Sequence, residues 1–412
     1  MKHIRVLHIT PSVRLLGARR SLLTLVKAIA GSRFEPLVLV PRPGPLTEEL
    51  DRRKLPWIAL ELPPWRKGYA WKIIPSRVRD LRQLLVEKSI DLIHCNEIYP
   101  NPHAVAASSK AALWKELFCN VTLKRQFGKP RQPIVTHNRL SVTPRMTENY
   151  LLGEASRLIA VSHAAAQDFR GEPWFMQKVR VVYNGIDFEE FEQAWKRRDR
   201  TRQRLGFGRD DFVIGSIGLL MPRKRPMFLL EAAPVILQKV PSAYILFVGD
   251  PSPGQQHYAD ELRSFAEKLG VASRVKFLSF QERIADIFAA LDLHVLISND
   301  EGFGRVVIEA AAAGVPTIAS RVGGIQELII QNETGILIGN EQARDDKVFW
   351  YYLEDFVAAV TELAYAPQLR QRMGQAAYEH CRARFSVEQY VKGVLAVFEE
   401  ALHEFETTQP PW

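Results

Sequence analysis

The sequence predicts an α/β protein with two doubly wound domains, each built on a parallel sheet. Short β-branched and apolar runs alternate along the chain with amphipathic stretches of helical length, which is the pattern of parallel strand–helix units. The alternation starts at Ile4 and starts afresh at Phe212. Because the chain has 412 residues, it is long enough for two domains that each bury a core.

Several of the expected strands are almost entirely apolar, as is typical of parallel strands covered on both faces. In the first half, strands are expected at residues 4–9, 36–40, 90–94, 133–136, 157–161 and 179–182. In the second half, they are expected at residues 212–217, 243–248, 274–278, 292–297, 316–319 and 335–338. Helices are expected at residues 21–30, 76–88, 226–239, 256–269, 283–290 and 387–405.

The boundary between the domains is predicted from a turn and a charged segment. Asn184-Gly185 is a turn signal, and a charge-rich stretch over residues 188–204 follows it. We therefore expect a first domain over residues 1–185, a linker over 186–210, a second domain over 211–385, and a C-terminal helix within 386–412 that packs back on the first domain.

Composition indicates a cytoplasmic globular protein. Hydrophobic residues make up 47% and charged residues 25% of the chain, and no apolar run reaches the roughly 18 residues of a membrane span. The first residues are too short and too charged for a signal peptide. Cys95, Cys119 and Cys381 are far apart and match neither a disulfide framework nor a zinc site.

Charge is unevenly divided between the two halves. Residues 1–185 contain 30 basic and 14 acidic residues, a balance of +16, and the remainder carries −7, which together give the net charge of +9. This asymmetry indicates either an anionic partner or a solvated basic surface. Four aromatic residues of the first half have basic neighbours: Trp57, Trp65, Tyr69 and Trp71. Two interpretations of these residues stay open, attachment to the inner, anionic face of a membrane or burial in a core.

The most informative segment, residues 298–310, follows an expected strand and enters an expected helix. Gly302 and Gly304 let the backbone approach a ligand closely, and amides at a helix N-terminus favour anionic or electron-rich oxygens. Glu301 and Glu309 can accept hydrogen bonds from the vicinal hydroxyl groups of a sugar or a ribose. The spacing alone is also compatible with an ordinary strand–turn–helix connection.

The segments around this one decide between these interpretations. Residues 313–320, 322–327 and 333–337 follow in order, and with them the chain resembles family 4 of the retaining GT-B glycosyltransferases, whose hallmark is two glutamates separated by seven residues. Residues 181–187 and 247–250 resemble two further segments of that family. The resemblance covers nearly the whole chain, and it implies two facing Rossmann-like domains with an interdomain cleft.

The resemblance also implies an activity: transfer of a sugar, with retention, from a UDP- or GDP-sugar to a hydroxyl of a glycan or lipid-linked acceptor. Such a transferase serves cell-envelope polysaccharide synthesis. Glu301 would contact the transferred sugar, and Glu309 the ribose. The implied catalytic residues are His137, Lys224 and Glu301. The implied donor-binding residues are Gly17, Gly218, Arg223, Lys224, Glu301, Gly302, Phe303, Gly304, Arg305, Val306 and Glu309.

Residues 218–226 match the family's donor-phosphate loop, in which Lys224 would neutralise the pyrophosphate leaving group. The family usually has an arginine directly after the glycine, where this chain has Leu219. Either Arg223 or Arg225 supplies the second cation, or the site works with one. In the first domain, only Gly17 of the family's usual glycine pair is kept. These departures leave an alternative to an active enzyme: a catalytically impaired protein with the same fold that binds nucleotide sugars or has a regulatory role.

His137 ends an expected strand where the family commonly has a histidine near the reacting sugar, and a purely structural role is the alternative. The chain has no Asp-x-Asp motif, so we expect transfer without a metal and without a cofactor beyond the nucleotide-sugar substrate. Four potential metal ligands match no recognised spacing. They are His94, Cys95, Glu97 and His103.

Two other classes of protein are disfavoured. No GxGxxG motif follows the first expected strand, which argues against a dinucleotide-dependent oxidoreductase. The basic residues 124–131 are compatible with nucleic-acid binding, but the family context favours a membrane surface or an anionic acceptor, and no nucleic-acid partner is expected.

Overall fold

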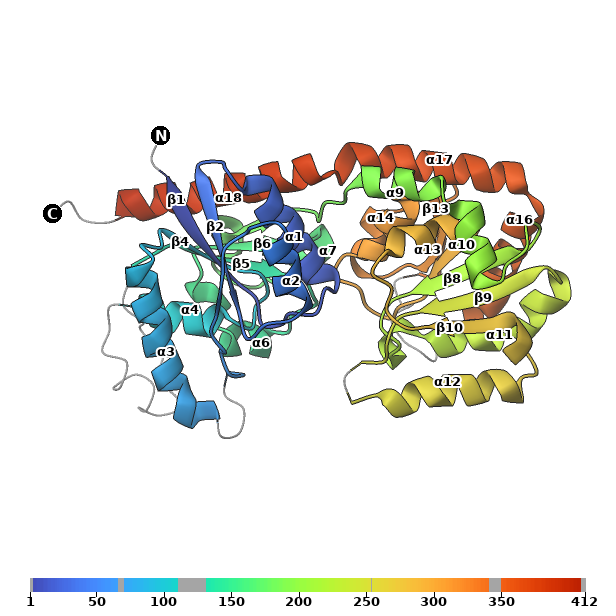
Figure 1. The fold of residues 1–412 in the computed structure, drawn as a ribbon, viewed down its shortest axis with the longest axis horizontal. Coiled ribbons are helices and arrows are strands. Elements are labelled where there is room, and N and C mark those ends of the chain that lie inside the picture. The colour runs from blue at the N-terminus through green and yellow to red at the C-terminus, as the bar shows by residue number, and fades with distance from the viewer. Residues whose placement is uncertain (1–2, 66–69, 110–130, 253, 341–349, 409–412) are drawn as a thin grey trace. The chain divides into compact units, whose positions relative to one another are not determined.

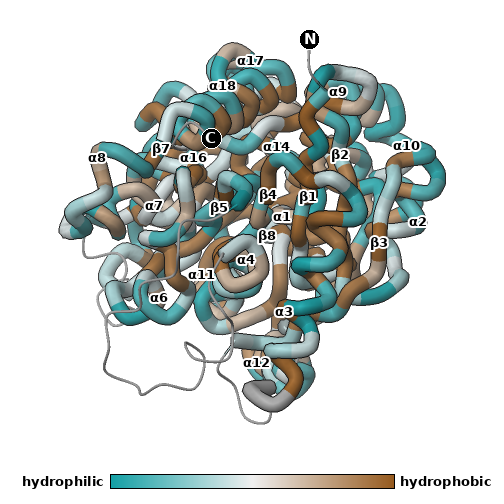
Figure 2. The backbone as a smooth tube through the Cα atoms, turned by 90° about the vertical axis from the view of Figure 1, so that its left-hand side faces the viewer, coloured by the Kyte–Doolittle hydropathy of each residue, from teal (hydrophilic) through white to brown (hydrophobic). Residues whose placement is uncertain are grey.

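The computed structural model describes residues 3–65, 70–109, 131–252, 254–340 and 350–408 (Figure 1). The chain divides into two compact units, one formed by residues 1–185 and 387–412 and the other by residues 186–386. Each unit has its own parallel sheet, and Figure 2 shows the hydrophobic residues concentrated on the strands. The two-domain parallel α/β fold expected from the sequence is therefore confirmed.

The first unit contains a seven-stranded sheet in the order β3-β2-β1-β4-β5-β6-β7. Its strands are β1 (Ile4–Ile9), β2 (Phe34–Val40), β3 (Trp57–Ala59), β4 (Leu92–Cys95), β5 (Ile134–Asn138), β6 (Arg157–Ala160) and β7 (Val179–Val181). The edge strand β3 is absent from the sequence-based prediction, because a run of three partly exposed residues is too short to show a period.

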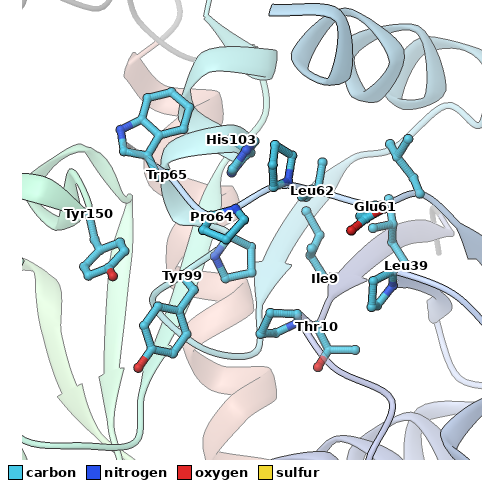
Figure 3. Close-up of a pocket in the computed structure, with 15 residues that line it drawn as sticks. Ile9, Thr10, Leu39, Glu61, Leu62, Pro64, Trp65, Tyr99, His103 and Tyr150 are labelled. Carbon is cyan, nitrogen blue, oxygen red and sulfur yellow. The ribbon is translucent and has the colours of Figure 1, made fainter. Parts of the chain in front are cut away.

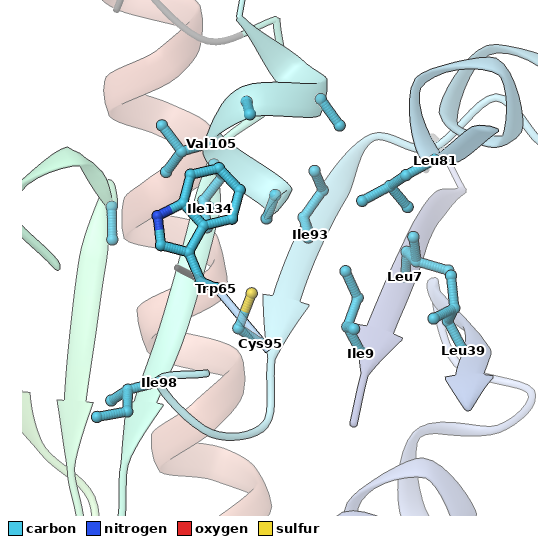
Figure 4. Packing of buried hydrophobic residues seen from close by; sticks show 14 of the residues in the cluster. Leu7, Ile9, Leu39, Trp65, Leu81, Ile93, Cys95, Ile98, Val105 and Ile134 are labelled. Atoms are coloured by element: carbon cyan, nitrogen blue, oxygen red, sulfur yellow. The ribbon is translucent and has the colours of Figure 1, made fainter. Parts of the chain in front are cut away.

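Two layers of helices cover this sheet. The helices of the unit are α1 (Gly17–Ile29), α2 (Pro45–Arg52), α3 (Ala70–Glu87), α4 (Asn101–Ser108), α6 (Pro144–Asn149), α7 (His163–Gln167), α8 (Phe175–Lys178) and α18 (Val387–Thr408). On the face towards α3 and α4, strand residues pack with Trp65, Leu81 and Val105 (Figure 4). On the other face, Val394 and Phe398 of α18 enter the core.

Helix α18 is fixed to the first unit by packing and by charge. It lies against α1, β5 and β6, and its Glu400 accepts from the guanidinium groups of Arg157 at 3.1 Å and Arg180 at 2.9 Å. A Cβ on Gly393 would lie 2.8 Å from the side chain of Val182, so the helix can approach the sheet only with glycine there. The expected return of the C-terminal helix to the first domain is confirmed.

The second unit contains a six-stranded sheet in the order β10-β9-β8-β11-β12-β13. Its strands are β8 (Phe212–Ile217), β9 (Ala243–Val248), β10 (Val275–Leu278), β11 (Leu293–Leu296), β12 (Thr317–Ser320) and β13 (Gly335–Ile338). Its helices are α9 (Phe188–Trp195), α10 (Arg198–Leu205), α11 (Pro226–Lys239), α12 (Gln256–Lys268), α13 (Ile284–Ala290), α14 (Arg305–Ala312), α16 (Leu353–Tyr365) and α17 (Pro367–Arg384).

Residues 186–210, expected as a linker, contain α9 and α10 and belong to the second unit. Both helices pack on α13. Arg198 and Arg202 hold the same carboxylate, that of Asp292, at 2.7 and 2.9 Å. Arg197 likewise pairs with Asp286 of α13 at 2.6 Å. These three arginines tie the segment to the second unit, while most of its other charged side chains are exposed.

Candidate functional site

The predicted donor-binding loops of the second unit meet at the carboxyl ends of the central strands of its sheet. The chain leaves β8 towards β9 on one side, while β11 lies on the other, so the strand order reverses between β8 and β11. Ligands of open α/β sheets bind beyond the carboxyl ends of strands at such a reversal. Here the loop after β8 contacts the loop after β11, because the amide of Asn299 donates to the carbonyl of Arg223 at 2.9 Å.

Lys224 and Glu301 form the charged centre of this site. The ammonium of Lys224 donates to Oε1 of Glu301, and the hydroxyl of Ser298 donates to the same oxygen at 3.2 Å. Arg223 donates to the carbonyl of Asp300, and its Nη1 lies 4.0 Å from Oε1 of Glu301. Only 19% of the Lys224 side chain and 11% of the Glu301 side chain are exposed, so both charges are largely shielded from water.

This environment disfavours the charged form of the lysine. The pKa of Lys224 is lowered from 10.5 to about 7, chiefly by desolvation and also by the positive charge of Arg223, while Asp300 opposes the change. The direct contact with the Glu301 carboxylate also favours the ammonium. An anionic ligand bound here would favour the protonated form of Lys224, which would then pair with the ligand's charge.

Two glycines of the 322–327 segment fix the main chain beside Glu301. Gly323 has φ +49°, and a Cβ on it would lie 2.0 Å from the Glu301 carbonyl oxygen. The amide of Gly324 donates to that carbonyl at 2.9 Å, and a Cβ there would lie 2.5 Å from the carbonyl oxygen of Gly302. The glycine pair therefore lets 3₁₀ helix η4 (Gly323–Glu327) support the loop that carries Glu301.

A second close approach shapes the phosphate loop. Gly249, at φ +143°, lies so close to Gly218 that a Cβ would be 2.0 Å from the Gly218 carbonyl oxygen. Beyond Gly218 the chain passes through Leu219, which is half-buried, and forms the short 3₁₀ helix η2 (Pro222–Lys224). The ends of β8 and β9 are thus held together beneath Lys224.

The second hallmark glutamate lies one turn inside α14. Nε of Arg305 donates to Oε1 of Glu309 at 2.9 Å, and Glu309 is 5% exposed. Gly304, at φ +91°, is the N-cap of this helix. Phe303 is buried and packs edge-to-face on Phe385.

The remaining predicted donor-site residues divide between the two units. Gly218, Gly302 and Val306 lie on the loops and helix start just described, and Gly302 is buried while the other two are half-buried. Gly17 and His137 belong to the first unit, where Gly17 is the exposed first residue of α1.

His137 is fully buried on the face of the first sheet that α18 covers. Its Nδ1 lies 2.7 Å from Nε2 of His94, whose Nδ1 lies 2.8 Å from Nδ1 of His8. The rings of His94 and His137 also contact Phe398 and Tyr390 of α18, respectively. Burial lowers the pKa of all three histidines, that of His8 to about 3. The contact of His137 with a sugar stays a prediction.

This row of three histidines was not found from the sequence. His8, His94 and His137 lie on three neighbouring strands that are far apart along the chain, so no local spacing indicates their contact. Of the four potential metal ligands, His94 is bonded to histidines and Glu97 is paired with Arg19 at 2.5 Å.

The predicted membrane-facing aromatic residues have different surroundings. Trp65 lies in the hydrophobic core, and the half-buried Trp57 donates to Asp51 at 2.7 Å. Tyr69, the Trp71 side chain and residues 124–130 lie outside the described part of the chain. Among the described residues, no helix is both long and apolar enough to cross a membrane.

Comparison with known proteins identifies the family. Residues 16–190 match Glycosyltransferase Family 4, and residues 197–380 match Glycosyl transferases group 1. The chain belongs to the group 1, family 4 glycosyltransferases.

The chain matches only part of the length of its relatives, 62% and 49% of the two described here. The chain is 32% identical to the D-inositol 3-phosphate glycosyltransferase of Actinosynnema mirum over 275 residues, which are 64% of this chain and 62% of that protein. It is 35% identical to the protein of the same name from Streptomyces avermitilis over 240 residues, 57% of this chain and 49% of that protein.

Solved structures of other proteins share the fold. Anabaena Alr3699/HepE in complex with UDP and glucose has a TM-score of 0.77 and 24% identity, covering 97% of this chain and 100% of that chain. WaaG, a glycosyltransferase involved in lipopolysaccharide biosynthesis, has a TM-score of 0.65 and 16% identity, covering 96% and 98%. These likenesses confirm the GT-B fold.

Proposed function

We propose that this protein is a retaining glycosyltransferase that moves a sugar from a nucleoside diphosphate donor to an acceptor hydroxyl. The observation that carries the proposal is the Lys224–Glu301 pair at the strand-order reversal, with Glu309 one turn inside α14. The two charges match the two ends of such a donor, because a diphosphate needs a cation and a sugar presents hydroxyl donors to a carboxylate.

The proposed chemistry uses both groups. As the bond between the anomeric carbon and the diphosphate oxygen breaks, negative charge grows on the leaving group, and Lys224 with the nearby Arg223 stabilises it. The acceptor oxygen forms its bond to the same face of the anomeric carbon, and its proton passes to a donor phosphate oxygen. The two cations serve the leaving group without a divalent ion.

A uridine nucleotide is the first donor to test, since the structurally similar HepE was solved with UDP-glucose. The proposed acceptor is a glycan or a lipid-linked glycan. The charge balance of +16 in residues 1–185 supports attachment of the protein to the anionic, cytoplasmic face of a membrane, where it would meet a lipid-linked acceptor.

The experiment measures nucleotide release from UDP-glucose, UDP-galactose, UDP-N-acetylglucosamine and GDP-mannose by the full chain and by Glu301→Ala. Release of one nucleotide by the wild type and its loss in the variant supports the proposal. Nucleotide binding by calorimetry without release or transfer, over a range of acceptors, would instead favour the impaired binding protein that Leu219 suggests.

A further inference from the structure

A pocket of about 380 Å³ opens at the carboxyl edge of the first unit's sheet, within the range of roughly 300–1,000 Å³ typical of small-molecule sites. Figure 3 shows Trp65 and His103 on one side of it and Glu61 with Leu39 on the other. The pocket lies on the face of the sheet opposite α18, so it is distinct from the histidine row.

Two side chains of this pocket are buried without a hydrogen-bond partner among the described residues. His103 is 1% exposed, and neither of its ring nitrogens is bonded. Trp65 is 7% exposed, and its indole N–H is likewise unbonded. The two rings pack edge-to-face with centroids 5.0 Å apart. Buried polar groups are normally satisfied, so these three atoms indicate a site that a ligand or ordered water completes.

The chemistry of these atoms restricts the ligand. Desolvation lowers the pKa of His103 to about 4, so at neutral pH its ring offers one donor and one acceptor, while Trp65 adds a donor. A hydroxyl group can satisfy both kinds of atom because it donates and accepts. A hydrocarbon chain would leave all three atoms unsatisfied.

The walls indicate a ring with apolar faces. Tyr99, Tyr150 and several prolines line the pocket, and such flat surfaces pack well against the C–H face of a sugar ring. Glu61 is exposed at the pocket and can accept from further hydroxyls. None of the lining residues in the described part of the chain is lysine or arginine, and a phosphate beside Glu61 would be repelled.

We propose that this pocket binds a neutral sugar unit of the acceptor, with its hydroxyl groups on His103 and Trp65. The inference rests on the proposed glycosyltransferase function and narrows its acceptor class. It separates this chain from the relatives named for D-inositol 3-phosphate, because the ring that binds here carries no phosphate.

Saturation-transfer NMR with the full chain tests the proposal. The probe is n-octyl β-D-glucopyranoside below its micelle concentration, which carries both a sugar ring and an alkyl chain. We expect the strongest transfer to the ring protons, and binding weakened about fivefold in Trp65→Phe, the effect of one lost hydrogen bond. Trp57→Phe is the matched control, because its indole donates to Asp51 outside this pocket.

A second test reverses the charge of the pocket. Glu61→Lys should bind glucose 6-phosphate more tightly than the wild type does, whereas Glu48→Lys on the exposed side of α2 should not. Strongest transfer to the alkyl chain, equal binding by Trp65→Phe, or tighter binding of glucose 6-phosphate than of the glucoside by the wild type would each overturn the proposal.

UDP calorimetry on the same samples separates this inference from the proposed function. An unchanged thermal unfolding profile shows that the pocket variants are folded, and unchanged UDP affinity shows that the donor site in the second unit is intact. If the protein binds UDP and releases UDP from a UDP-sugar but binds no neutral glycoside, the pocket assignment fails and the proposed function stands. If glycosides bind and no nucleotide sugar does, the proposed function fails.

Discussion

The ammonium of Lys224 donates to the carboxylate of Glu301, which joins the loop after β8 to the loop after β11. Each residue comes from a different side of the strand-order reversal. The two charges satisfy one another. A bound donor would place its diphosphate at the lysine and its sugar hydroxyls at the glutamate, so the pair is the centre of the predictions that follow.

Glu301→Gln should reduce transfer about 10- to 100-fold, because an amide replaces a charged acceptor of hydrogen bonds from the sugar. The substitution keeps the shape of the side chain. It also leaves Lys224 without its partner, so the melting temperature must be measured beside the transfer rate. Glu267→Gln on the exposed surface of α12 is the control. Wild-type activity in Glu301→Gln contradicts the assigned role.

Binding of UDP should take up a proton above pH 7. The pKa of Lys224 is lowered to about 7, so the side chain is fully protonated well below pH 7 and loses its charge as the pH rises through that value. A diphosphate favours the charged form and raises the pKa again. Calorimetry in buffers of different ionisation enthalpy measures this uptake, and affinity should decline towards pH 9. Lys224→Arg, which stays charged, should show neither effect.

Gly323→Ala should lower both stability and UDP affinity. Its Cβ would lie 2.0 Å from the Glu301 carbonyl oxygen, so the loop must move. Gly270→Ala is the matched control, because Gly270 has φ +71° and nothing lies within 4 Å of a Cβ there. The control should lose about 1–2 kcal/mol of stability from left-handed strain alone and keep its UDP affinity. Equal UDP affinity in both variants would contradict the supporting role of Gly323.

Arg223→Gln should weaken UDP binding about tenfold, the scale of one charge-assisted hydrogen bond. Arg223 is the cation whose guanidinium lies 4.0 Å from Glu301. Adding Leu219→Arg in the same chain should restore affinity, since it places a cation where the family usually has one. If Arg223→Gln binds UDP like the wild type, the site works with Lys224 alone.

The first unit should lose stability as the pH falls below about 6.5. His8, His94 and His137 have pKa values lowered by burial in the folded chain, so they stay neutral there while the unfolded chain takes up protons. Each histidine contributes at most about 1.4 kcal/mol per pH unit to this slope. The urea midpoint from pH 7 to 5 measures it. His8→Leu should show a shallower slope, and an unchanged slope would contradict the account.

Much of the fold follows from local patterns. The strand at Phe212–Ile217 and the helix at Pro226–Lys239 have the predicted bounds, because a buried apolar run and a proline at a helix start are visible in any stretch of sequence. The charged segment over 186–210 was misjudged as a linker for the same local reason. Arg197, Arg198 and Arg202 look solvated until Asp286 and Asp292, far along the chain, are placed beside them.

The sequence by itself determined the family and named Lys224, Glu301 and Glu309, since these residues belong to motifs that are continuous along the chain. Only the tertiary structure decided that Lys224 contacts Glu301, that Gly323 supports the loop that carries Glu301, and that His137 lies in a row with His8 and His94. It also decided that Trp65 and His103 share a pocket. Each of these contacts joins residues from different strands or loops, and side-chain contacts of that kind depend on the order in which strands pair, which no local spacing encodes.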